Sequence, residues 1–162
     1  MKKRLICKAI SKGLLTYGVA VGLSVSSGIA IAAGQIAVVT NDTVVESGEE
    51  FGATVVLNGD GQYDVYVGIT GGVFGADFQV FTPGGLVPWV QASGPPPKLM
   101  DNVNLANMSI KERMIALVPR MPLAGYAGDY AIYGALSAPG QFMQQLQDGT
   151  VILDGPLAIQ VK

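Results

Sequence analysis

The sequence has no histidine and only one cysteine, Cys7. Histidine is the commonest general acid or base near neutral pH, and together with cysteine it supplies most zinc ligands. The two absences exclude Ser-His-Asp and Cys-His catalytic groups and the usual zinc sites. A lone cysteine also excludes an intramolecular disulfide, so the stability of a folded domain must come from its packed core.

Acidic residues are missing before Asp42, whereas basic residues gather at the start of the chain. The basic residues are Lys2, Lys3, Arg4, Lys8 and Lys12. An apolar run over residues 14–23 follows, and then the small residues of Ala30-Ile31-Ala32. This order predicts a signal peptide over residues 1–32 and export to the periplasm, the cell surface or the extracellular space. A retained anchor over residues 13–33 is the alternative, because this stretch is uncharged and long enough to span a bilayer.

The charge of the exported part differs from that of the whole chain. Removal of the leader leaves five basic against twelve acidic residues, a net charge of −7. An acidic surface without a Lys/Arg cluster repels phosphate groups, so we expect no nucleic-acid binding. The same repulsion argues against binding to anionic membranes once the leader is removed.

Catalysis through paired carboxylates needs no histidine, so the twelve acidic residues leave this route open. However, no spacing in the sequence pairs any two of them into a site. Ser109 and Lys111 are the only close serine–lysine pair after the leader, and their spacing does not fit Ser-x-x-Lys. We therefore predict that the chain is not an enzyme and needs no cofactor or metal, with a small carboxylate hydrolase as a remote alternative.

From residue 35 onward, apolar residues alternate with polar ones in short runs, and Gly, Pro, Asn and Asp cluster between the runs. This pattern predicts strands separated by turns. The expected strands are residues 35–40, 53–57, 62–70, 76–82, 86–91, 113–118, 129–136, 150–153 and 156–161. So many short strands in residues 33–162 indicate an all-β antiparallel sandwich or barrel domain of about 7–9 strands.

The clearest expected pair is a hairpin over residues 53–70, with an Asn-Gly-Asp-Gly turn at its centre. Alternation in its second strand places Asp64 on the solvated face. The oxygen-bearing residues Asn58, Asp60 and Asp64 also have part of the spacing of a calcium loop. The acidic ligand expected further on is missing, so we favour a plain turn over a metal site.

Three further segments carry local signals. The triple proline at residues 95–97 predicts an extended surface crossover between sheets. Ser109-Ile110-Lys111-Glu112 has the pattern of a capping box and favours one helical turn. Residues 141–147 lack β-branched side chains, which favours a short helix before the Asp148-Gly149 bend.

Three stretches taken together have a familiar pattern: residues 64–69, residues 81–89 and residues 127–136. They contain Asp-Val-Tyr-Val-Gly-Ile, then Phe-Thr-Pro-Gly-Gly running to Pro-Trp, and then a Gly-x-Tyr strand beginning at Gly128. This pattern resembles immunoglobulin-like modules of secreted bacterial proteins. The resemblance implies two packed antiparallel sheets, but the two core cysteines of antibody domains are missing, so only the architecture is implied.

Aromatic residues are the best candidates for partner contact. Tyr66, Phe81 and Tyr133 fall opposite the expected core residues of their strands, which predicts an aromatic outer face. A register error of one residue, or cover by the crossover, would bury these rings instead. Trp89 is the only tryptophan; it can stack on a sugar, although burial between two sheets is the usual place for such a ring.

These expectations favour an exported, non-catalytic structural or adhesive β-sandwich, whose partners are copies of itself or other exported proteins. Self-assembly could proceed by strand donation, in which residues 35–45 complete a neighbour's sheet. The alternative is a secreted binding module for carbohydrate or another exported protein, with Tyr126, Trp89 and the proline crossover as contact residues.

Overall fold

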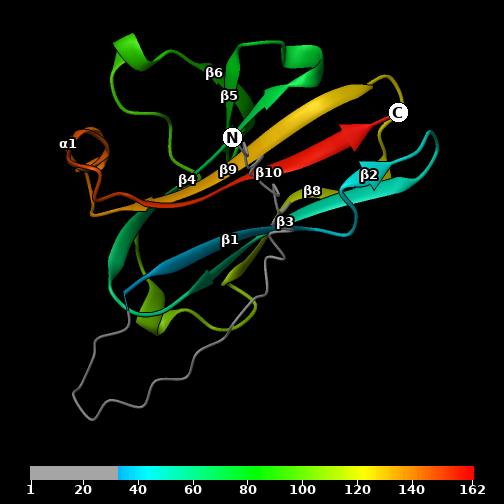
Figure 1. Ribbon diagram of the computed structural model, residues 1–162. Helices are drawn as coiled ribbons and strands as arrows, with labels where there is room; N and C mark the ends of the chain where they lie inside the picture. Colours follow the sequence, from blue (N-terminus) through cyan, green and yellow to red (C-terminus); the bar gives the residue numbers. More distant parts are fainter. Residues whose placement is uncertain (1–32) are drawn as a thin grey trace, which may run out of the picture. The chain divides into compact units, whose positions relative to one another are not determined.

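The computed structural model describes residues 33–162 (Figure 1). The predicted signal peptide, its cleavage site, Cys7 and nearly all of the alternative membrane anchor lie outside the described residues. The strands and helices in chain order are β1 (Gln35–Thr40), β2 (Val44–Val45), β3 (Glu50–Asn58), β4 (Gln62–Gly71), η1 (Gly72–Phe74), β5 (Phe78–Thr82), β6 (Gly85–Trp89), η2 (Gln91–Ser93), β7 (Met100–Asn104), η3 (Leu105–Asn107), β8 (Met114–Pro122), β9 (Gly128–Ser137), α1 (Phe142–Asp148) and β10 (Ile152–Val161).

The strands form two layers, which Figure 1 shows one above the other. A small sheet has the order β1-β3-β8, and a large sheet has the order β2-β10-β9-β4-β5-β6, with β7 paired to the start of β4. Every pairing is antiparallel except that of β2 with β10. The prediction of a mostly β, antiparallel sandwich is confirmed. Within the described part of the chain, no helix is long and apolar enough to cross a membrane.

The core lies between the two sheets and follows the alternation in the sequence. On β3 every second side chain is buried, and Val55 is fully enclosed. From the large sheet Val65, Val67 and Ile132 meet this row, together with Ile159 of the last strand. Burial of each such side chain contributes roughly 1.5–3 kcal/mol. In β9 and β10 the buried core side chains likewise fall at alternate positions, as at Tyr130 and Ile132 or at Ile159 and Val161.

The expected hairpin over residues 53–70 is wrong, because β3 belongs to the small sheet and β4 to the large one. The intervening turn does contain the positive φ angles that its glycines allow, 89° at Gly59 and 103° at Gly61. A Cβ atom at Gly59 would overlap the carbonyl oxygen of Ala33, so this position requires glycine. The turn residues specify a reversal, but they do not specify whether the second strand pairs with the first or crosses to the other layer.

Several smaller expectations also need correction. The two strands expected at residues 150–153 and 156–161 are one strand, β10, with an irregularity between Asp154 and Leu157. The proline crossover joins β6 to β7, which belong to the same sheet and not to different sheets. The short strands β2 and β7 were not expected, because neither has a run of alternating apolar residues. The short helix expected at residues 141–147 is confirmed as α1.

The edge strands of the two sheets are protected against pairing with another chain. In β1 the Val38 N–H donates to a carboxylate oxygen of Asp154 at 2.8 Å. Strand β8 has two register irregularities and contains Pro119, while β6 contains Pro88 and β2 has two residues. Prolines, bulges and short lengths are the devices that proteins use to block edge-to-edge association.

Candidate functional site

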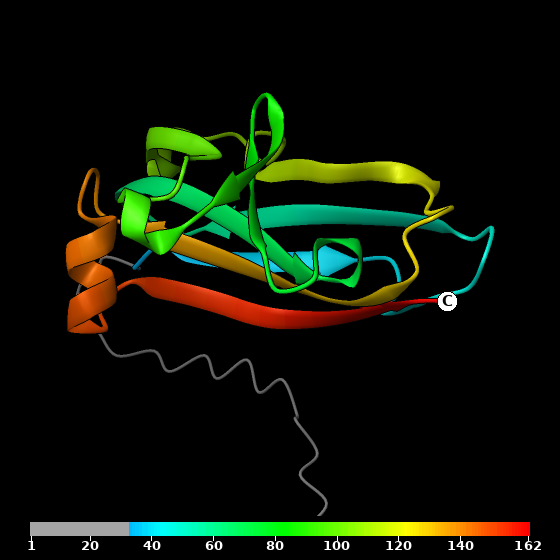
Figure 2. The ribbon, with the colours of Figure 1, turned by 90° about the horizontal axis from the view of Figure 1, so that it is seen from above.

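The outer face of the large sheet carries an apolar pocket of about 170 Å³. Five aromatic rings line it, and we call it the aromatic pocket: Tyr66, Phe78, Trp89, Tyr133 and Phe142. They come from four strands and one helix that are distant in sequence, namely β4, β5, β6, β9 and α1. Figure 2, which looks down on the sandwich, shows α1 across one end of β9 and β10.

The sheet supplies the floor of the pocket. Gly68 of β4 pairs with Tyr133 on one side and Val80 on the other. A Cβ atom at Gly68 would overlap the ring of Phe78, so glycine lets this ring lie against the β4 backbone. From there Phe78 contacts Tyr133 and Trp89, each with ring centroids 5.7 Å apart, at tilted and edge-on angles that aromatic pairs favour.

Two segments outside the sheet form the walls. Helix α1 directs Phe142 and Leu146, one turn apart, toward the sheet. The centroid of the Phe142 ring lies 4.4 Å from the centroid of the Tyr66 ring and 6.5 Å from that of the Trp89 ring. The second wall is the crossover, residues 90–99, which contributes the buried Pro96. Leu153 of β10, which is 62% exposed, lies at the rim.

Three of the four residues predicted to contact a partner, Tyr66, Trp89 and Tyr133, are brought together in this pocket. Phe81 is not, because its side chain faces the core between the sheets and is 7% exposed. Alternation puts Phe78 and Val80 on one face of β5 and Gln79 and Phe81 on the other, and the more apolar of these two faces is the one that lines the pocket. The outward ring is Phe78, which the sequence analysis missed.

The expectation that these rings are freely exposed is wrong for Tyr66, which is buried beneath α1. The alternative of burial by the crossover holds in part, since Pro96 and Tyr66 line the same pocket. Trp89 is half-buried and lies on the outer face of the sheet, not between the sheets. Tyr126, the other suggested contact residue, lines a separate apolar cavity of about 190 Å³ between the sheets.

Two polar side-chain groups at the aromatic pocket already have protein partners. The Trp89 indole N–H donates to the carbonyl of Gly94 at 3.0 Å, and the Tyr66 hydroxyl donates to Asp64 at 3.3 Å. Burial raises the pKa of Tyr66, so its hydroxyl remains a proton donor. The surface left for a ligand is therefore almost wholly apolar.

Asp64 lies beside the pocket and is fully buried, so its predicted position on a solvated face is wrong. Alternation does place the Asp64 side chain on the outer face of the sheet, but that face is covered at this end. Burial alone would raise the pKa of Asp64. This effect is outweighed by three hydrogen-bond donors, which hold the pKa at about 2: the N–H of Gly140, the ammonium of Lys98 and the N–H of Asn102. The hydrogen bond to Asp101, followed by the bond to Asp64, raises the pKa of Lys98, so the pair is charged at neutral pH.

Several of the other candidate residues for chemistry have structural partners. The side-chain oxygen of Asn58 accepts a hydrogen bond from Arg113 at 3.1 Å, and Asp64 is held as described above. Ser109 and Glu112 exchange the two hydrogen bonds of a capping box, although they form a turn and not an α-helix. Among residues 33–162, no three Asp, Glu, His or Cys side chains gather as a metal site would require.

Comparison with known proteins finds no matching family, no matching curated sequence and no matching solved structure.

Proposed function

We propose that this chain is an exported, non-catalytic adhesive module with an immunoglobulin-like sandwich, and that its aromatic pocket receives an apolar side chain of another exported protein. The single observation that carries the proposal is the set of five aromatic rings gathered on an outer sheet face. Export itself rests on the charge and apolar pattern of residues 1–32.

The order of the strands supports the immunoglobulin-like assignment. The N-terminal segment divides between the two sheets as β1 and β2, and β10-β9-β4-β5-β6 follow one another in the large sheet. This order matches that of the larger sheet in variable-type immunoglobulin domains. Near the start of β9 the Tyr130 hydroxyl donates to the carbonyl of Tyr126 at 2.7 Å, as in a tyrosine corner. Ile132 follows two residues later, where antibody domains have a cysteine.

The chemistry of the pocket supports a protein partner. Aromatic residues dominate the energetic centres of protein interfaces, where they form desolvated pockets for anchor side chains. An apolar cavity of about 150 Å³ is known to hold a benzene ring. The aromatic pocket is on the same scale, so one aromatic or branched aliphatic side chain is a suitable occupant.

A carbohydrate partner is less well supported. Sugars need hydrogen-bonding groups beside the aromatic ring on which they stack. Here the Trp89 indole and the Tyr66 hydroxyl are engaged by Gly94 and Asp64, so among the aromatic residues of the pocket only the hydroxyl of Tyr133 is left for a sugar. Self-assembly by strand donation is also less well supported, because residues 35–40 pair along their whole length with β3 and the sheet edges are protected.

The binding experiment uses purified residues 33–162, tested for co-precipitation with defined exported proteins and for self-association by sedimentation velocity. Leu153→Glu places a charge at the pocket rim and should abolish the complex. Ile110→Glu is the matched control, because Ile110 is 80% exposed and does not line the pocket. Equal binding by the wild type and both variants would contradict the proposal, and binding to a polysaccharide array would favour the carbohydrate alternative.

Export has its own test. Expression of the full chain in a bacterium, followed by N-terminal sequencing of the secreted or periplasmic product, should give a protein that begins at Ala33. A folded product in the cytosol with the leader still attached would contradict export.

A further inference from the structure

Four hydrogen-bond donors converge on the buried carboxylate of Asp64. One oxygen accepts from the backbone N–H of Asn102 at 2.8 Å. The other accepts from the backbone N–H of Gly140 and the ammonium of Lys98, each at 2.8 Å, and from the Tyr66 hydroxyl at 3.3 Å. Since a buried charge is tolerated only where it is paired and hydrogen-bonded, this arrangement is complete.

The donors belong to the segments that form the aromatic pocket. Lys98 lies in the crossover, two residues after the pocket residue Pro96, and Asn102 follows in β7. Gly140 lies two residues before Phe142, at the approach to α1. Asp64 therefore joins both walls of the pocket to β4, the strand that carries Tyr66. The wall segments make few ladder hydrogen bonds of their own, apart from that of the Leu99 N–H with the carbonyl of Val65.

The backbone opposite Asp64 departs from regular geometry in a way that brings a donor to the carboxylate. Strand β7 shifts register here, so Asp101 and Asn102 together lie opposite the single residue Asp64. Asn102 has φ of 47°, the only positive φ among the described non-glycine residues. This conformation is unfavourable for most residues with a Cβ atom, and such positions and β-bulges are over-represented beside functional sites. A residue in a regular β-ladder would not need a positive φ.

We propose that Asp64 is the positioning residue of the aromatic pocket. Its carboxylate holds the end of the crossover through Lys98 and the adjoining strand β7 through Asn102, and it holds the approach to α1 through Gly140. This inference rests on the proposed function insofar as the pocket binds a partner. The positioning role itself concerns only the geometry of the pocket. Without the carboxylate, both walls lose their common attachment. Phe142 and Pro96 then separate from Trp89, and the pocket opens to solvent.

The test uses Trp89 as a reporter, since it is the only tryptophan in the chain and lies in the pocket. Asp64→Asn keeps the side-chain shape but removes the charge. We expect acrylamide quenching of Trp89 to rise at least about twofold, with a red-shifted emission, at temperatures well below unfolding. The control is Val55→Ala in the core of the small sheet, which lowers stability without contact with the pocket. Its quenching should remain that of the wild type.

Lys98→Met is a second variant, which keeps the protein testable if Asp64→Asn does not fold. Lys98 is 33% exposed, and its loss leaves the two backbone donors on Asp64, so a smaller rise in quenching is expected. The positioning role would be overturned if acrylamide quenching of Trp89 in the folded Asp64 and Lys98 variants equalled that of the wild type. It would also be overturned if quenching in these variants rose no more than in a Val55→Ala protein of equal melting temperature. The co-precipitation test is independent of this readout, so the adhesive function and the positioning role can fail separately.

Discussion

The two faces of the large sheet are built by different rules. The inner face packs aliphatic side chains such as Val65 and Val67 against a second sheet that follows the same alternation. The outer face carries aromatic rings and is covered only by a seven-residue helix and an irregular crossover. On the inner face, hydrophobic burial is sufficient to hold the layers together. On the outer face, the cover is attached through one buried carboxylate, Asp64, and this makes its geometry dependent on a few polar bonds.

The largest effect is expected on the inner face. Ile132→Ala removes a fully enclosed side chain from the centre of the core and should lower the free energy of unfolding by about 3 kcal/mol. Urea denaturation followed by circular dichroism measures this loss. Trp89 emission in the folded state should be unchanged, since Ile132 points away from the aromatic pocket. A red-shifted Trp89 in the folded variant would show that the two faces are not independent.

The next effect is expected on the outer face. Gly68→Ala places a methyl group where the ring of Phe78 lies, so the ring must move away from β4. Overpacking of this kind costs about 2 kcal/mol of unfolding free energy. In contrast to Ile132→Ala, this substitution should also change the Trp89 emission, because Phe78 contacts Trp89. Unchanged emission in the folded variant would contradict the close fit of Phe78 on Gly68.

Acid should weaken the outer face selectively. The pKa of Asp64 is about 2 in the folded protein and about 3.8 when unfolded, so its contribution to stability is present above pH 3.8 and is lost as the pH falls through 2. At pH 3 the linkage predicts a loss of about 1 kcal/mol from this residue. Thermal unfolding of the wild type and Asp64→Asn between pH 6 and pH 2 measures it. Parallel curves for the two proteins would contradict the assignment.

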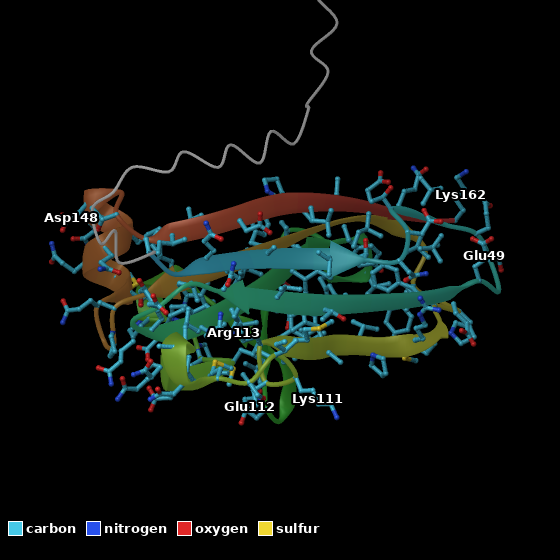
Figure 3. The ribbon with its side chains drawn as sticks, turned by 90° about the horizontal axis from the view of Figure 1, so that it is seen from below. Glu49, Lys111, Glu112, Arg113, Asp148 and Lys162 are labelled. Atoms are coloured by element: carbon cyan, nitrogen blue, oxygen red, sulfur yellow. The ribbon has the colours of Figure 1, made fainter. Side chains whose placement is uncertain are left out.

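The smallest effect is expected at the end of the sandwich remote from α1. Figure 3 shows Lys162 and Glu49 at one end and Asp148, the last residue of α1, at the other. Lys162 and Glu46 form an exposed ion pair at 2.7 Å. Such pairs contribute little, so Glu46→Gln should leave the urea midpoint and Trp89 emission unchanged within error. A clear loss of stability would show that this pair contributes more than its exposure implies.

Much of the inner face could be predicted from the sequence, because alternation in β3, β9 and β10 reports burial against a second sheet directly. The hairpin failed for a different reason. The Asn-Gly-Asp-Gly turn fixes the backbone locally, whereas the choice between pairing and crossing depends on the partners of β3 and β4 elsewhere in the chain. Residues 35–40 and 114–122 take both sides of β3, which leaves no edge for β4.

The outer face was harder to predict. Alternation placed Tyr66 and Tyr133 correctly on the outer side, but it failed in β5, where the more apolar face, with Phe78 and Val80, is the outer one. It also gave no sign that Asp64 would be buried, because three of its four hydrogen-bond partners, Lys98, Asn102 and Gly140, lie 34 or more residues away in the chain. Lys98 does follow the triple proline, yet a single lysine in a loop has no partner that local spacing can identify.

The protected edges described for the small and large sheets have a consequence for any assembly of this protein. Molecules whose sheet edges disfavour shared hydrogen-bond ladders associate through side chains instead. Fibres held by shared ladders resist all but strong denaturants. A complex held by contacts at the aromatic pocket would instead dissociate on dilution or in mild detergent, and its components would separate folded and able to bind again.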